Sequence, residues 1–427
     1  MLETSLRLPH SGVVLANRIA KAAMSEVLGD ALGAPSERLI RLYERWGKSG
    51  AGLLISGHVL VDRRARAEVG NVVIEDDRDL PMLRRWATAA QAGGAQMWLQ
   101  LNHAGRQSPR RLSREPVAPS AVAMKGFAGA FAKPRALTEL EIEDIIQRFA
   151  RAAAVAQRAG FAGVEIHAAH GYLISQFLSA RTNLRDDAWG GDPVRRARFL
   201  LEVVRAVRAA VGPAFPIGVK LNSADFQRGG FTIEQAMDVA RALDGAGIDL
   251  LEVSGGNYES PAMAGSGDTM RASSREREAY FLTYAKQIRT VTSVPILLTG
   301  GMRTRATMED ALASGAVDVI GLARPMTYAP ELPRQLLDGT VDAAPAVSIR
   351  SRIRAIDDAL QVMWFLAQIH LLGDGREPDL RLGKWKALWR GLRASVFASK
   401  RAATQISAGA APADIVEVEM KMTSGVK

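Results

Sequence analysis

The chain has 427 residues, of which 48% are apolar, enough for one large domain with an appendage or for two domains. It contains no cysteine, which excludes disulfides, thiolate metal sites and cysteine-ligated iron–sulfur clusters. The formal charge is +10, but the basic residues are mostly arginines interleaved with acids, without the long basic tracts typical of nucleic-acid binding.

These properties predict a cytoplasmic protein with neither a membrane span nor a nucleic-acid partner. There is no run of about 18 or more apolar residues, the length that a transmembrane helix requires. The start, Met1-Leu-Glu-Thr-Ser, lacks the basic and apolar segments of a secretory signal. We expect the positive charge to attract anionic small molecules.

Eight apolar, strand-like runs alternate with stretches of helical period. The runs cover residues 18–24, 52–61, 95–101, 163–168, 216–222, 248–255, 294–300 and 317–323. The helical stretches cover 35–48, 80–92, 138–159, 193–211, 232–246, 274–290 and 304–314, and several precede a glycine that can cap a helix: Gly50, Gly93, Gly160, Gly247 and Gly315. Since the runs are apolar almost throughout, we expect a parallel sheet covered on both faces.

This alternation predicts the α/β class, as a (β/α)8 TIM barrel with a C-terminal helical extension. The fingerprint G-x-G-x-x-G does not follow the first run, which argues against an open dinucleotide-binding sheet. We expect the barrel over residues 1–340, and a helical extension and tail over 341–427. The extension contains an apolar helical stretch at 353–372 and a Trp-rich stretch at 382–394.

The fourth run ends in His167-Ala-Ala-His170-Gly-Tyr172, which places two imidazoles and a phenol at one strand end. In barrels of this class the carboxyl ends of the strands form the active site. The three side chains could hold and protonate one oxyanion, or they could be metal ligands or packing residues. The chain has only six histidines and no second spaced pair, so we predict no metal site.

Two further strand ends carry polar groups with more than one interpretation. The amide of Gln100 could tie strands together, or it could meet the donor and acceptor of a uracil-like edge. Lys220 lies inside a strand run, where it could form a Schiff base or face a charge that develops on a cofactor. The residues alone do not separate these alternatives.

The last two strand ends suggest a phosphate site. Gly300-Gly301 allows backbone N–H groups to approach an anion, and Ala323-Arg324 adds a guanidinium one unit later. A glycine pair after a strand can also be an ordinary tight turn. The prediction of a phosphate site therefore depends on the position of this pair after the seventh strand.

Taken together, these strand ends resemble the Old Yellow Enzyme family of FMN-dependent ene-reductases, the NADH:flavin oxidoreductases. The resemblance runs from about residue 17 to 330 and is most specific in His167-Ala-Ala-His-Gly-Tyr-Leu-Ile-Ser-Gln-Phe-Leu-Ser. It continues through Thr182-Asn183, Asp187, Trp189-Gly-Gly-Asp and residues 196–199, with support from Asn17-Arg18, residues 100–106 and residues 320–325.

The resemblance implies FMN held non-covalently in the barrel, with NADH or NADPH as co-substrate. It implies roles at the following positions: Ala23, Met24 and Ser25 along the flavin edge, Gly57 beneath the ring, Gln100 at the pyrimidine edge, Lys220 beside N1 and O2, and Gly300, Gly301, Ala323 and Arg324 at the phosphate. It further implies that His167 and His170 bind the substrate oxygen and that Tyr172 delivers a proton.

Two positions depart from the family pattern: Ser25 stands where many relatives have Thr or Cys, and Lys220 where many have Arg. The absence of cysteine also excludes the iron–sulfur domain of the longer dienoyl-CoA reductase branch. Electrons are therefore expected to pass directly from nicotinamide to FMN to substrate.

The expected function is NAD(P)H-dependent reduction of an electron-poor alkene, an α,β-unsaturated carbonyl or nitro compound. Two alternatives stay open: a flavin-free aldolase or isomerase using Lys220, and a flavin-binding protein without catalytic activity. The sequence does not determine the natural alkene, the stereochemistry, the choice between NADH and NADPH, or whether the chain forms a homo-oligomer.

Overall fold

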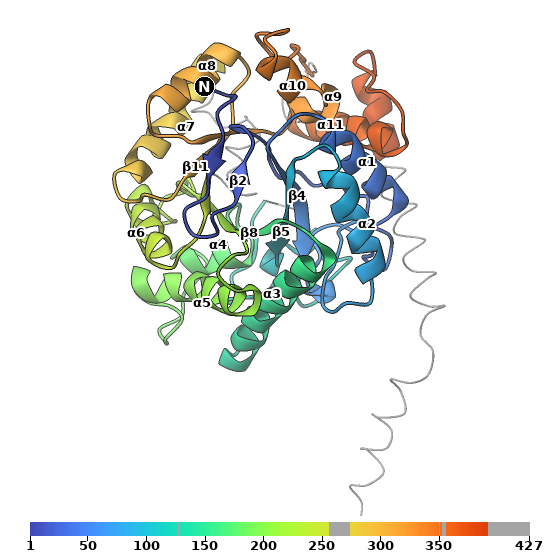
Figure 1. Cartoon of the computed structure of the whole chain (residues 1–427). Helices are drawn as coiled ribbons and strands as arrows, with labels where there is room; N and C mark the ends of the chain where they lie inside the picture. Colours follow the sequence, from blue (N-terminus) through green and yellow to red (C-terminus); the bar gives the residue numbers. More distant parts are fainter. Residues whose placement is uncertain (127–128, 256–273, 350, 352–355, 392–427) are drawn as a thin grey trace, which may run out of the picture.

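The computed structural model describes residues 1–126, 129–255, 274–349, 351 and 356–391. Eight parallel strands form a closed barrel inside a ring of helices (Figure 1). In barrel order from the N-terminus they are β3 (Ile19–Lys21), β4 (Leu53–Leu60), β5 (Gln96–Asn102), β8 (Gly163–Ala168), β9 (Ile217–Asn222), β10 (Leu250–Ser254), β11 (Ile296–Thr299) and β12 (Val319–Leu322). Each overlaps one predicted apolar run, with ends that differ by at most three residues, so the (β/α)8 prediction is confirmed.

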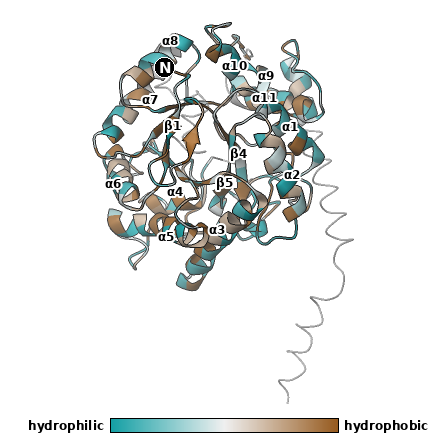
Figure 2. Cartoon of the chain, viewed as in Figure 1, coloured by the Kyte–Doolittle hydropathy of each residue, from teal (hydrophilic) through white to brown (hydrophobic). Residues whose placement is uncertain are grey.

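The seven predicted helices of the ring begin and end within two residues of their predicted limits, and two further helices, α9 and α10, were not predicted. They are α1 (Glu37–Gly47), α2 (Leu80–Gln91), α3 (Glu139–Ala159), α5 (Pro193–Val211), α6 (Ile233–Gly245), α7 (Ser274–Arg289), α8 (Arg305–Ala313), α9 (Pro325–Tyr328) and α10 (Leu332–Leu337). Thr138 caps α3 through a capping box, and Gly160 ends it in the left-handed conformation. The cap predicted at Gly93 is wrong, because Gly94 is the residue with positive φ. Figure 2 shows mixed hydropathy along these helices, as expected for one apolar face each.

A hairpin that the sequence pattern did not predict closes the amino end of the barrel. Strands β1 (Leu6–Arg7) and β2 (Val14–Leu15) pair antiparallel. The hairpin packs Leu8 and Leu15 against Trp98 and other side chains at the amino ends of the barrel strands. Each strand has two residues, too few to show an alternating pattern.

Side chains inside the barrel change from apolar to polar along the strands. Trp98 fills the amino end, where a Cβ at Gly163 or Gly218 would lie 2.6 or 2.9 Å from its ring. Because side chains alternate along a strand, the next inward positions are these polar ones: Gln100 on β5, Glu165 on β8, Lys220 on β9 and Glu252 on β10. The inward positions beyond them carry the candidate site.

The extension after the barrel docks onto its outside. Helix α11 (Asp357–Gly373) packs against α1 and α9, and its fully buried Trp364 donates a hydrogen bond to the Leu382 carbonyl (2.9 Å). The predicted packed helix is therefore present, with residues 353–355 of that prediction outside the described residues. The domain boundary near residue 340 stays a prediction, and most of the predicted tail lies outside the described residues.

Residues 384–391 are helical, within the Trp-rich stretch, while 392–394 lie outside the described residues. No helix among the described segments is long and apolar enough to cross a membrane.

Candidate active site

The two histidines and the tyrosine predicted at the end of the fourth strand lie together in the structure. The rings of His167 and His170 are 5.1 Å apart between centroids, and those of His167 and Tyr172 are 4.9 Å apart. The turn after β8 places them, with His170 at a positive φ of 61° and its N–H donating to Asn222 Oδ1 (3.2 Å). Tyr172 then starts the short helix α4 (Leu173–Leu178).

Both imidazoles are neutral at physiological pH. Burial chiefly lowers the pKa of each ring well below its usual value, and the nearby Lys220 lowers it further. The Ala169 N–H donates to His167 Nδ1 (3.2 Å), so the ring proton of His167 is on Nε2. His170 Nε2 lies 2.8 Å from Ser254 Oγ. His167 is thus fixed as a hydrogen-bond donor without carrying a charge.

A third imidazole, His58 at the end of β4, faces the same cluster and was given no role by the sequence. Its ring lies 5.2 Å from that of Tyr172 and nearly perpendicular to it. His58 Nε2 lies 2.9 Å from Glu68 Oε2 and 3.2 Å from Ser25 Oγ, and Asn102 Nδ2 lies 3.3 Å from Nδ1. Its place at a strand end, directly after Gly57, is the sequence feature that could have identified it.

Glu26 explains why the chain has glycine at position 57. A Cβ at Gly57 would lie 2.1 Å from Glu26 Oε2 and 2.2 Å from the Met24 carbonyl oxygen. The Gly57 N–H donates to Glu26 Oε1 (2.8 Å), and Tyr43 Oη donates to the same oxygen. Lys21 Nζ is 3.6 Å away, and burial chiefly lowers its pKa to about 8. This buried network holds the end of β4 where its pairing register with β5 shifts.

The predicted phosphate residues come from neighbouring strands. Thr299 and Gly321 are register partners on β11 and β12, so the segments that follow them lie side by side. Gly300 and Gly301 have positive φ of 137° and 77°, a backbone conformation that glycine adopts without strain. The guanidinium carbon of Arg324 lies 5.8 Å from the Phe365 ring centroid, so α11 contacts this corner.

All the predicted site residues therefore end up at the carboxyl half of one barrel. Ala23, Met24 and Ser25 follow β3, which pairs with β12, and the Ala22 N–H donates to the Leu322 carbonyl (2.9 Å). Gln100 pairs with Glu165, one inward position before His167 on β8, and Lys220 pairs with His167 itself. An amide and a cation at one end, with a glycine turn and a guanidinium at the other, match the pyrimidine and phosphate ends of FMN in chemistry.

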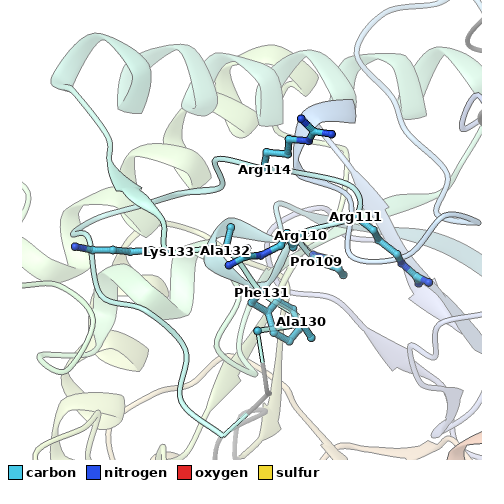
Figure 3. A pocket seen from close by; sticks show the side chains of 9 residues that line it. Pro109, Arg110, Arg111, Arg114, Ala130, Phe131, Ala132 and Lys133 are labelled. Atoms are coloured by element: carbon cyan, nitrogen blue, oxygen red, sulfur yellow. The ribbon is translucent and has the colours of Figure 1, made fainter.

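A basic hollow of about 1080 Å³ opens in the loop after β5 (Figure 3). It is lined by Pro109, Arg110, Arg111, Arg114, Gly129, Ala130, Phe131, Ala132 and Lys133. The loop is tied to the imidazole cluster, since Gln107 Nε2 donates to the His170 carbonyl (3.1 Å). In Figure 3 the charged ends of Arg111, Arg114 and Lys133 point to different sides, so they do not converge on one anion.

Within the described part of the chain, no group of three or more potential metal ligands comes together.

Comparison with known proteins places the chain in a family. A model of the NADH:flavin oxidoreductase / NADH oxidase family matches residues 10–342. An NADH-dependent flavin oxidoreductase of Hypocrea jecorina is 40% identical over 365 residues, covering 79% of this chain and 90% of that protein.

Two solved structures share the fold at similar coverage. An old yellow enzyme homologue from Zymomonas mobilis has a TM-score of 0.69 at 27% identity, covering 81% of this chain and 95% of the other. Morphinone reductase in complex with tetrahydroNAD has a TM-score of 0.67 at 28% identity, covering 81% and 92%.

Proposed function

The chain belongs to the NADH:flavin oxidoreductase / NADH oxidase family, and we propose that it reduces activated C=C bonds of unsaturated carbonyl or nitro compounds. Family membership makes it a flavin-dependent oxidoreductase with an NADH-type co-substrate. The observation that carries the proposal is the buried cluster of a neutral imidazole donor, a second imidazole and a phenol at the end of β8.

We propose that side chains and backbone groups from six strand ends bind FMN. Gln100 and Lys220 would take the pyrimidine edge, Ala23, Met24 and Ser25 the flank of the ring, Gly57 its underside, and Gly300, Gly301, Ala323 and Arg324 the phosphate. When bound, FMN supplies two-electron chemistry, accepting hydride from NADH or NADPH and passing it to the β-carbon of the alkene. With one site for both reactants, nicotinamide and alkene are expected to occupy it in turn.

His167 and His170 would bind the carbonyl or nitro oxygen of the alkene. Hydride arrival at the β-carbon moves negative charge to that oxygen, and the His167 Nε2–H is oriented to donate to it. A well-aimed donor of this kind contributes about 2.7–4 kcal/mol in enzymes that stabilise an oxyanion. A neutral imidazole donates without repelling the nearby Lys220 cation.

Tyr172 would deliver a proton to the α-carbon. Its ring is buried between His58 and His167, which holds the phenol near the site where the oxygen of the alkene would bind. General-acid catalysis by a positioned side chain typically accelerates a step by about 10²–10⁴-fold.

The aldolase alternative loses its basis in the structure. A Schiff-base lysine must present a neutral amine to a substrate carbonyl. Lys220 is buried, and its ammonium forms an ion pair with Glu252 (2.7 Å). Membership in a family of oxidoreductases also removes the non-catalytic alternative.

Anaerobic reoxidation of the reduced enzyme tests the proposed substrate class. We expect cyclohexenone, maleimide or a nitroalkene to reoxidise the flavin faster than oxygen does, with one alkene consumed per flavin. A saturated ketone such as cyclohexanone is the control and should leave the flavin reduced. If no activated alkene outpaces oxygen, the assignment to alkene reduction fails, although the flavin assignment stands.

A further inference from the structure

The barrel interior contains a buried polar group of four residues, three of them ionisable, beside and below His167. Gln100, Glu165, Lys220 and Glu252 come from neighbouring strands β5, β8, β9 and β10, and each is at most 3% exposed. Interiors of such barrels are mostly filled by branched apolar side chains. Buried charges are costly unless paired, so this group needs a physical explanation.

Two hydrogen bonds within this group leave one carboxylate oxygen without a donor. Lys220 Nζ donates to Glu252 Oε1 (2.7 Å), and Gln100 Nε2 donates to Glu165 Oε2 (2.7 Å). Within the described part of the chain, Glu252 Oε2 is buried and accepts no hydrogen bond. The side chains of Glu165 and Thr299 both lie close to Glu252. A proton on Glu165 would give Glu252 a donor and remove the repulsion between two adjacent carboxylates, whereas the Thr299 hydroxyl would supply only a donor.

Electrostatics places that proton on Glu165. Burial, and after it the negative charge of Glu252, raise the pKa of Glu165 well above its usual value. Burial is the largest influence on Glu252 and raises its pKa, but Lys220, Glu165 and Thr299 together outweigh it and leave that pKa below the usual value. One carboxyl and one carboxylate beside one ammonium form a buried group without net charge.

We propose that Glu165 and Glu252 share one proton, carried by Glu165, and position Gln100 and Lys220 for the cofactor. The neutral carboxyl of Glu165 donates to Glu252 and accepts from Gln100, which fixes the orientation of the Gln100 amide. Glu252 holds one of the three N–H donors of Lys220 and offsets part of its charge. The shared proton does not depend on the proposed function. The effect on FMN does rest on the proposed function.

The charge state of this group would affect how strongly the protein prefers reduced over oxidised FMN. Reduction leaves negative charge near the pyrimidine end of the flavin, which the Lys220 ammonium would stabilise. The carboxylate of Glu252 weakens this effect because it lies in contact with the same ammonium. Glu252 therefore limits the preference for the reduced cofactor, and Glu165, being neutral, does not.

Infrared spectroscopy at pH 7 tests the shared proton without any cofactor. A protonated carboxyl has a C=O stretch that a carboxylate lacks. The difference spectrum of wild type minus Glu165→Gln should show one acid C=O band, and wild type minus Glu143→Gln, an exposed position on α3, should show none. Absence of the band in the first spectrum would mean that Glu165 is ionised and would overturn the proposal.

Redox titration of the FMN-loaded protein tests the positioning role through an asymmetry between two isosteric variants. In Glu165→Gln the amide replaces the neutral carboxyl as donor and acceptor, so the ratio of FMN dissociation constants, oxidised over reduced, should stay within about twofold. In Glu252→Gln the negative charge leaves the contact with Lys220, and this ratio should rise about tenfold. For a two-electron couple a tenfold change equals about 30 mV in midpoint potential.

Equal effects of the two variants, or a larger effect of Glu165→Gln, would show that the pair is merely structural. If Glu252→Gln does not fold, Glu252→Asp replaces it, because the shorter side chain withdraws the charge from Lys220 and should move the ratio in the same direction. A chain that binds no FMN would refute the proposed function but would leave the infrared result intact.

Discussion

At the scale of single residues, the local backbone determines the chemistry of the imidazoles. The Ala169 N–H fixes the proton of His167 on Nε2, and His170, at a positive φ of 61°, has its ring centroid 5.1 Å from that of His167. Burial keeps both rings neutral. The sequence placed the two histidines at a strand end, but it could not give the tautomer, which depends on one backbone hydrogen bond.

Removing both imidazoles should weaken the binding of phenols, which present an oxyanion to the same donors. We expect His167→Ala with His170→Ala to raise the phenol dissociation constant at least about tenfold, since a hydrogen bond to a charged group is worth about 1.5–3 kcal/mol. FMN should stay bound. The measurement is a titration of the long-wavelength charge-transfer absorbance, with the exposed His10→Ala as control. An unchanged titration would refute the role of the pair.

The residues that surround Gly57 could not be predicted from the sequence. The sequence predicted a glycine beneath a flavin ring, and the structure adds that Glu26 and Met24 occupy the space a Cβ would need. Glu26 is 31 residues away in the chain, and no local pattern marks it as the partner of Gly57.

At the scale of elements, α11 connects the C-terminal extension to the candidate site. His370 Nε2 lies 3.2 Å from the Glu26 carbonyl oxygen, and Arg41 donates to the Gly373 carbonyl (2.9 Å). The Phe365 ring lies near Arg324. The extension thus contacts both the segment after β3 and the predicted phosphate corner, so we expect its docking to stabilise the barrel.

Truncating the buried anchor of α11 tests this docking. Trp364→Ala should lower the free energy of unfolding by about 3–5 kcal/mol, the usual cost of deleting a fully buried aromatic side chain. Trp385→Ala, at a position 54% exposed in the same extension, should change it by less than about 0.5 kcal/mol. Urea denaturation followed by circular dichroism gives both values. Similar small losses for both variants would mean that α11 does not stabilise the barrel.

Elements could be predicted where they are long and repeated. Helix α3, with 21 residues, a capping box and a glycine cap, was bounded to within a residue at each end. The two-residue strands β1 and β2 and the six-residue α4 carry too few residues to show a period.

At the scale of the whole molecule, the order of the strands brings the site together. Eight apolar runs predicted the barrel, and the rule that active sites lie at the carboxyl ends of its strands gathered residues from Ala23 to Arg324 into one place. What the sequence could not predict are the contacts across strands, such as Lys220 with Glu252 and Gln100 with Glu165. They depend on strand register, which single-sequence patterns do not determine.

The proton from Tyr172 is expected to serve the alkene and not the nicotinamide. Stopped-flow measurement of the two half-reactions of Tyr172→Phe separates these two roles. We expect reoxidation by an activated alkene to slow about 10²–10⁴-fold, the typical contribution of a general acid, while flavin reduction by NADH or NADPH stays nearly unchanged. Equal slowing of both half-reactions, or no slowing of the oxidative one, would contradict it.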